Sequence, residues 1–241
     1  MTQRSRFDTA ALPRVGDPAA AERGLARWTR LGQTPDDGRS REGAAFDLEM
    51  ALPVIFGNSP YLGESALAEP DLVRAVLTDG PDRVIEGLIE ETRDAPLGAR
   101  QRFMAALRQH KRRVALAVAL ADIFDLWSLE QITAALSRFA DLAIRQALNH
   151  TMLEAAQRGE LELAGETDPQ TTSGLAVLGM GKLGALELNY SSDLDLIVMF
   201  APDKLRCRGR DGPMALAVRL TRALVYLLEQ RTQQGYVFRV D

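Results

Sequence analysis

The sequence predicts an α+β protein, in which an N-terminal helical bundle precedes a smaller domain with a mixed sheet and helices. Apolar residues recur at three- and four-residue steps between residues 47 and 163, and short apolar runs ended by glycine first appear after residue 174. The polar segment GETDPQTTSG separates the two patterns. We therefore expect a poorly ordered or loosely packed lead-in, a helical domain, a linker and a C-terminally truncated second domain, over residues 1–45, 46–164, 165–174 and 175–241.

The bulk composition is that of a folded protein with an ordinary core. Hydrophobic residues make up 46% and charged residues 26% of the 241 residues, and the formal net charge is −4. A nucleic-acid-binding domain is usually basic, so this charge argues against nucleic acid as a partner. The chain has one cysteine, no apolar signal segment at its N-terminus and no apolar run long enough for a bilayer. We expect a soluble, cytoplasmic protein without a membrane partner.

Local signals place the helices of the first zone. Residues of one apolar stripe follow Ser128, which forms a predicted capping box with Gln131. The segment Gly57–Pro60 predicts a turn between two helices, and further prolines interrupt the helical pattern. The stripe residues are Ile132, Leu136, Phe139, Ala143 and Ala147, and the further prolines are Pro70, Pro81 and Pro96.

The second zone predicts the order strand, short helix, strand, long helix, strand. The runs 175–180 and 194–200 are the first two strands. Pro213 suits the first turn of a helix over 213–234, and Gly235 suits its end. The closing segment YVFRVD alternates, with Val237, Arg239 and Asp241 on one face of a third strand.

The glycines after the first strand allow two hypotheses. Gly179, Gly181 and Gly184 form G-x-G-x-x-G, which is typical of a dinucleotide-binding turn. The roughly eight residues that follow are too few for the usual crossover between parallel strands, which argues against this hypothesis. Alternatively, Gly181 and Lys182 form a turn whose backbone N–H groups and ammonium group meet phosphate oxygens.

Asp193 and Asp195 form the pattern D-x-D at the start of the second strand. Side chains alternate along a strand, so both carboxylates share a face while Leu194 points into the core. Two carboxylates on one face can bridge two divalent cations for phosphoryl chemistry, and magnesium prefers such oxygen ligands. Asp241 has the correct parity to supply a third carboxylate from a neighbouring strand.

The glycine turn followed by D-x-D resembles the signature of the DNA polymerase β-like nucleotidyltransferase superfamily. The fuller string GMGKLGALELNYSSDLDLIV resembles one of its families, the bifunctional glutamine synthetase adenylyltransferase/adenylyl-removing enzymes. GNSPYL, LSRFADLAI and GYVFRVD are also similar to that family. Lys182 departs from the superfamily pattern, in which glycine or serine is usual at this position.

The resemblance implies regulation of glutamine synthetase in nitrogen assimilation. It places the chain in the N-terminal half, which removes AMP from a tyrosine of glutamine synthetase by metal-dependent phosphorolysis that releases ADP. The other half adds AMP from ATP. Since family members continue beyond the position of Asp241, we expect an incomplete nucleotidyltransferase domain and a fragment that is inactive alone.

Further expectations concern residues and partners. The resemblance implies two Mg²⁺ ions on Asp193, Asp195 and Asp241, and phosphate or nucleotide contacts from Gly181, Lys182 and Ser192. Glutamine synthetase and a PII-type nitrogen-signalling protein are the implied partners. A small-molecule nucleotidyltransferase of the antibiotic-modifying kind and a non-catalytic helical adaptor remain as alternatives.

Overall fold

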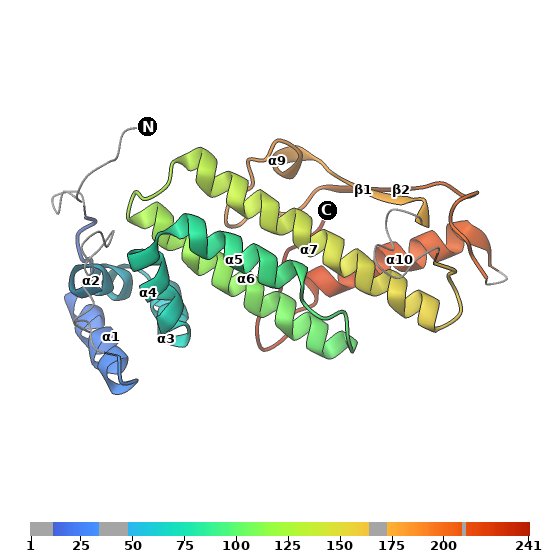
Figure 1. Ribbon diagram of the computed structural model, residues 1–241. Coiled ribbons are helices and arrows are strands. Elements are labelled where there is room, and N and C mark those ends of the chain that lie inside the picture. The colour runs from blue at the N-terminus through green and yellow to red at the C-terminus, as the bar shows by residue number, and fades with distance from the viewer. Residues whose placement is uncertain (1–11, 34–47, 164–172, 209–210) are drawn as a thin grey trace. The chain divides into compact units, whose positions relative to one another are not determined.

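The computed structural model describes residues 12–33, 48–163, 173–208 and 211–241 (Figure 1). Helices form most of it, and two short strands follow the longest helix, which confirms the predicted α+β class. In chain order the elements are α1 (Pro18–Arg30), α2 (Leu48–Asn58), α3 (Pro60–Ala68), α4 (Pro70–Asp79), α5 (Pro81–Arg93), α6 (Arg100–Ile123), α7 (Leu129–Gln157), β1 (Leu175–Gly179), α9 (Gly181–Gly184), β2 (Leu196–Phe200) and α10 (Gly212–Glu229).

The chain forms two compact units. The first comprises the described parts of Met1–Leu88 together with Arg112–Ile132, and the second comprises Ile89–Lys111 together with the described parts of Thr133–Asp241. The division therefore falls within the long helices, whereas the sequence predicts a boundary at the linker 165–174. Most of that linker lies outside the described residues. The predicted domain boundaries stay a prediction.

Helix α1 lies within the segment predicted to be a poorly ordered lead-in. Trp28 is completely buried, and its ring meets the ring of Phe56 edge-on at a centroid distance of 6.2 Å. A Cβ atom on Gly24 would lie only 2.7 Å from Phe56 Cδ1, so glycine permits the close approach of α1 to α2. For residues 12–33 the prediction of poor order was wrong, because a single tryptophan anchors a helix that is otherwise short of large apolar residues. Residues 1–11 and 34–45 lie outside the described residues.

The predicted helix boundaries of the first unit are confirmed at the capping residues. Ser59 accepts a hydrogen bond from the Leu62 N–H at 3.2 Å, and Pro60 occupies the first turn of α3. At the start of α7, the Ser128 N–H donates to Gln131 Oε1 at 3.0 Å, and the Gln131 N–H donates to Ser128 Oγ at 3.4 Å. These reciprocal bonds form the predicted capping box.

The core of the second unit is built on α7, and the predicted apolar stripe of that helix is buried. Arg108 of α6 is also buried, with its guanidinium donating to main-chain carbonyls of Leu227, Gln230 and Gly235. These bonds hold the end of α10, which stops at Glu229 and not at the predicted Gln234. The helix prediction was wrong here because Gly235 belongs to a tight turn with Thr232, and Gln230 already has an extended ψ of 118°.

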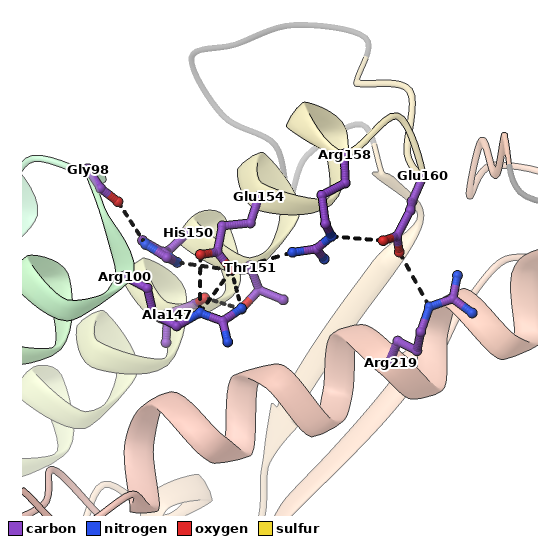
Figure 2. Close-up of polar contacts among 9 residues, drawn as sticks. All are labelled: Gly98, Arg100, Ala147, His150, Thr151, Glu154, Arg158, Glu160 and Arg219. Atoms are coloured by element: carbon purple, nitrogen blue, oxygen red, sulfur yellow. Dashed lines mark hydrogen bonds and ion pairs between the residues drawn. The ribbon is translucent and has the colours of Figure 1, made fainter.

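Charged groups connect the helices of the second unit on the surface side of α7 (Figure 2). Glu154 pairs with Arg100 of α6 and lies 3.9 Å from Arg158. Glu160 accepts a hydrogen bond from Arg158 at 2.8 Å and lies 3.3 Å from Arg219 of α10. Opposite charges that share partners in this way lose less side-chain entropy per contact than isolated surface pairs do. The network therefore ties α6 and α10 to the end of α7.

The sheet consists of β1 and β2, which run antiparallel with Val177 opposite Val198. One face is open, since the side chains of Ile197 and Met199 are about half exposed, at 47% and 48%. The predicted third strand is reduced to one parallel bridge between Leu194 and Val240. The sheet itself is therefore antiparallel, and the last segment contributes this single parallel bridge in place of a strand.

No helix in the described ranges is long and apolar enough to cross a membrane.

Candidate functional site

The glycine turn connects β1 to α9 and lies against Asp195. The Met180 N–H donates to the Asp195 carbonyl at 2.8 Å, which brings the turn beside the start of β2. Gly181 has a φ of 52°, in the left-handed region that favours glycine. A Cβ atom at this position would lie closer than 3.0 Å to Asp195 Oδ2. The absence of a side chain at Gly181 therefore makes room for the carboxylate of Asp195.

The other glycines serve packing within the same turn. A Cβ atom on Gly184 would lie 2.7 Å from the Gly179 carbonyl oxygen, so the four-residue helix α9 folds tightly back onto β1. A dinucleotide-binding turn joins a strand to a parallel neighbour through a longer helix. Because β1 and β2 are antiparallel, the structure excludes the dinucleotide hypothesis.

The backbone register brings the three predicted aspartates to one face of the sheet. The Leu194 N–H donates to the Arg239 carbonyl, and the Asp241 N–H donates to the Leu194 carbonyl, both at 2.9 Å. In a parallel pair, residues opposite each other direct their side chains to the same face. Leu194 is fully buried on one face, so Asp193 and Asp195 share the other face with Arg239 and Asp241.

Arg239 contacts the first aspartate directly. Its Nε donates to Asp193 Oδ1, and its terminal amino group donates to the Ser191 carbonyl at 3.2 Å. The carboxylate of Asp193 raises the pKa of Arg239 above its ordinary value, chiefly through this hydrogen bond. Asp193 is about one-third exposed, with 37% of its side-chain surface accessible. The guanidinium of Arg239, in the C-terminal segment, therefore neutralises the negative charge of Asp193.

The third aspartate is held through the main chain. The Leu196 N–H donates to the Asp241 carbonyl at 3.0 Å, so Asp241 lies between Leu194 and Leu196 and opposite Asp195. The preceding N–H, that of Val240, donates to Glu229 Oε1 at 2.8 Å. Glu229, the last residue of α10, thus helps to fix the position of residues 240–241 beside the start of β2.

The remaining predicted site residues lie on the same turn or on the loop before β2. Lys182 is exposed on α9, and its carbonyl accepts from the Glu187 N–H at 2.8 Å. The Ser192 hydroxyl donates to Asn189 Oδ1 at 2.8 Å and so closes the loop that leads to Asp193. In the part of the chain that the structure describes, no three His, Cys, Asp or Glu side chains are gathered as a ready metal site. The donors nevertheless fit magnesium in chemical type, since all three are carboxylates on one face.

Comparison with known families identifies the chain. The model of the glutamate-ammonia ligase adenylyltransferase family matches residues 50–241, which include the glycine turn and all three aspartates. The chain belongs to this family. Membership confirms the resemblance drawn from the string around D-x-D.

Curated relatives are similar over nearly the whole chain. A bifunctional glutamine synthetase adenylyltransferase/adenylyl-removing enzyme from Rhodopseudomonas palustris strain CGA009 is 40% identical over 233 residues, covering 95% of this chain and 24% of the relative. Proteins of the same name from Rhizobium meliloti and Bradyrhizobium diazoefficiens are 40% and 41% identical, over 79% and 76% of this chain and 20% and 19% of theirs. The chain therefore spans at most about a quarter of the length of these relatives.

Two residues of this family member's site carried only weak signals in the sequence. The alternation of YVFRVD places Arg239 on the face of Asp241, but it does not reveal the pairing of Arg239 with Asp193. Glu229 lies at the end of an apolar helix, and the helical pattern of the sequence does not predict that its carboxylate binds another segment. Both contacts depend on how distant segments align, and no local pattern encodes that alignment.

Proposed function

We propose that this chain forms part of the site that removes AMP from an adenylylated tyrosine of glutamine synthetase. An oxygen of inorganic phosphate attacks the phosphorus of AMP, the bond from that phosphorus to the tyrosine oxygen breaks, and ADP leaves. The tyrosine oxygen then takes a proton from solvent. The observation that carries the proposal is the shared face of Asp193, Asp195 and Asp241 beside the glycine turn.

Each residue of the face has a distinct part in this proposal. Asp193, Asp195 and Asp241 would hold divalent cations, and magnesium bound there supplies charge neutralisation at the reacting phosphoryl group. The turn at Gly181 presents main-chain N–H groups, and Lys182 presents a mobile positive charge, for phosphate oxygens. Ser192 orders the loop before Asp193 through Asn189, and its hydroxyl would contact the nucleotide.

The names of the relatives suggest the protein substrate. Those proteins are called bifunctional glutamine synthetase adenylyltransferase/adenylyl-removing enzymes, so glutamine synthetase is the protein substrate that we propose. We place this chain in the adenylyl-removing half and propose that the longer protein also transfers AMP from ATP. A PII-type signalling protein is the proposed regulator, and the cytoplasm is the proposed compartment.

The decisive experiment measures ADP release from adenylylated glutamine synthetase, in the presence of phosphate and Mg²⁺, by the natural protein that carries this chain. Asp193→Asn and Asp195→Asn should each lower the rate on the order of a thousandfold, because each removes a ligand charge at the reacting phosphorus. Asp203→Asn is the matched control, since Asp203 is an exposed aspartate in the turn after β2.

Two outcomes would contradict the proposal. Either variant could keep more than about a tenth of the wild-type rate, which is far more activity than an enzyme should retain after losing a metal ligand. Alternatively, the wild-type protein could release AMP or no nucleotide at all, which would contradict attack by phosphate. The Asp203→Asn variant should match the wild type in both rate and product.

A further inference from the structure

The pair formed by Arg239 and Asp193 places a fixed positive charge on a carboxylate of the proposed metal site. Arg239 reaches Asp193 through Nε and the Ser191 carbonyl through its terminal amino group. One guanidinium thus holds the carboxylate and the loop that precedes it. A hydrogen bond between two charged groups is stronger than a neutral one, so the pair fixes the orientation of Asp193.

The pairing and metal binding exclude each other at Asp193 Oδ1. A carboxylate oxygen that accepts from a guanidinium directs its lone pair toward that group, and a cation on the same oxygen would bring two positive charges together. Arg239 must therefore move away for Asp193 to serve as a ligand through Oδ1, the oxygen that accepts from the guanidinium in this structure. The guanidinium is about half exposed, with 54% of its side-chain surface accessible, so it can swing into solvent or toward an anion without unpacking the core.

We propose that Arg239 is a positioning residue that occupies Asp193 in the metal-free site and competes with the divalent cation for it. This inference rests on the proposed function only for the identity of the metal site. The exchange keeps Asp193 neutralised and the loop 191–193 ordered before the metal arrives. With a divalent cation on Asp193, the guanidinium of Arg239 would be free to pair with phosphate groups of the substrate.

The neighbouring aspartates make the competition specific to Asp193. Asp195 is held against the glycine turn, and Asp241 is held by main-chain bonds to Leu194 and Leu196. The hydrogen bond to Asp193 is the largest influence on the pKa of Arg239, and the charge of Asp241 raises that pKa further. Removing the guanidinium should therefore free one ligand and leave the arrangement of the other two unchanged.

The test measures Mn²⁺ binding to this chain by electron paramagnetic resonance of the free ion, so it needs no catalytic activity. Arg239→Gln should bind Mn²⁺ roughly tenfold more tightly than the wild type at low salt, because a competing charge next to the cation is gone. Arg239→Lys separates competition from a general electrostatic effect. It keeps the positive charge but loses the planar fork, so it should also bind more tightly than the wild type, by a factor of about three.

Arg231→Gln is the matched control, since Arg231 is an exposed arginine in the preceding turn whose guanidinium lies over the Tyr236 ring. This variant should bind Mn²⁺ as the wild type does. The proposal is overturned if Arg239→Gln binds no more tightly than the wild type, or if it binds no Mn²⁺ at all. It is also overturned if Arg239→Lys matches the wild type, because the charge alone would then explain the effect.

The result can be separated from the test of the proposed function. If Arg239→Gln tightens Mn²⁺ binding while Asp193→Asn retains ADP release, the competition is real and the assigned reaction is wrong. If Asp193→Asn abolishes ADP release while Arg239→Gln leaves Mn²⁺ affinity unchanged, the reaction stands and the competition does not.

Discussion

Replacing Gly181 with alanine tests whether the glycine turn positions the carboxylate of Asp195. The new methyl group would lie closer than 3.0 Å to Asp195 Oδ2 and 3.4 Å from its Cγ. The first separation is too short for any stable contact, so the carboxylate must rotate away from the turn. Asp195 is exposed and can do so without disturbing the core.

Two effects of different size follow from this geometry. The φ of 52° at Gly181 lies in a region that costs an alanine about 1 kcal/mol of folding free energy. The rotation of Asp195 moves its oxygens by roughly 1 Å, and a misplacement of that size costs on the order of a hundredfold in rate. We therefore expect a small loss of stability and a large loss of ADP release.

Gly159→Ala provides the matched control. Gly159 has a φ of 72° in the same unit, and an added Cβ atom there would meet no atom within 4 Å. Both variants pay the backbone cost, and only Gly181→Ala displaces a carboxylate. Urea unfolding of this chain compares their stabilities, and ADP release by the natural protein that carries the chain compares their activities.

A role of Gly181 in placing the Asp195 carboxylate is refuted if the two variants lose ADP release to the same extent. It is equally refuted if Gly181→Ala keeps wild-type activity at the expected loss of stability, because Asp195 would then tolerate the rotation. A loss of stability much greater than that of Gly159→Ala would show that the turn supports the fold and not the carboxylate.

Two further predictions concern Lys182 and His150. Lys182→Ala should raise the phosphate concentration needed for half-maximal ADP release without changing urea unfolding, because this exposed side chain acts as a point charge; unchanged phosphate dependence would contradict its role. Burial lowers the pKa of His150 below its ordinary value of 6.5, against an opposing effect of Glu154, so the unfolded chain takes up the proton first. The free energy of unfolding should therefore be constant above pH 6.5 and fall below it, which urea unfolding at about pH 7.5 and about pH 5.5 will measure. The pKa of Glu154 is lowered from its ordinary value, so Glu154 stays ionised at the lower of these two pH values. The His150→Gln variant should lose most of the difference in unfolding free energy between the two pH values.

The features that the sequence predicts correctly are those determined by neighbouring residues. Ser128 and Gln131 are three positions apart, and their reciprocal hydrogen bonds require only one helical turn. Likewise, the short spacing between the glycines and D-x-D leaves no room for a parallel crossover, and β1 and β2 are indeed antiparallel. Alternation along a strand suffices to put Asp193 and Asp195 on one face.

The features that the sequence does not reveal depend on contacts between distant segments. Trp28 anchors α1 through Phe56, although its own segment has too few large apolar residues to predict a packed helix. The end of α10 is set by Arg108, a residue more than a hundred positions earlier, which binds the Gln230 and Gly235 carbonyls. Capping signals alone favour Gly235 as the end of the helix, because they contain no information on such a partner.

The three aspartates are held by three kinds of interaction, and this difference bears on how the site can change. Asp195 is placed by steric room at Gly181, and Asp241 by main-chain hydrogen bonds, neither of which salt screens appreciably. Asp193 alone is held by an ion pair between partly exposed side chains, and salt and competing cations weaken such a pair. In the proposed site a divalent cation would therefore compete with Arg239 for Asp193, whereas main-chain hydrogen bonds set the backbone positions of Asp195 and Asp241. We therefore expect Arg239, which contributes no ligand, to govern the affinity of the proposed site for metal.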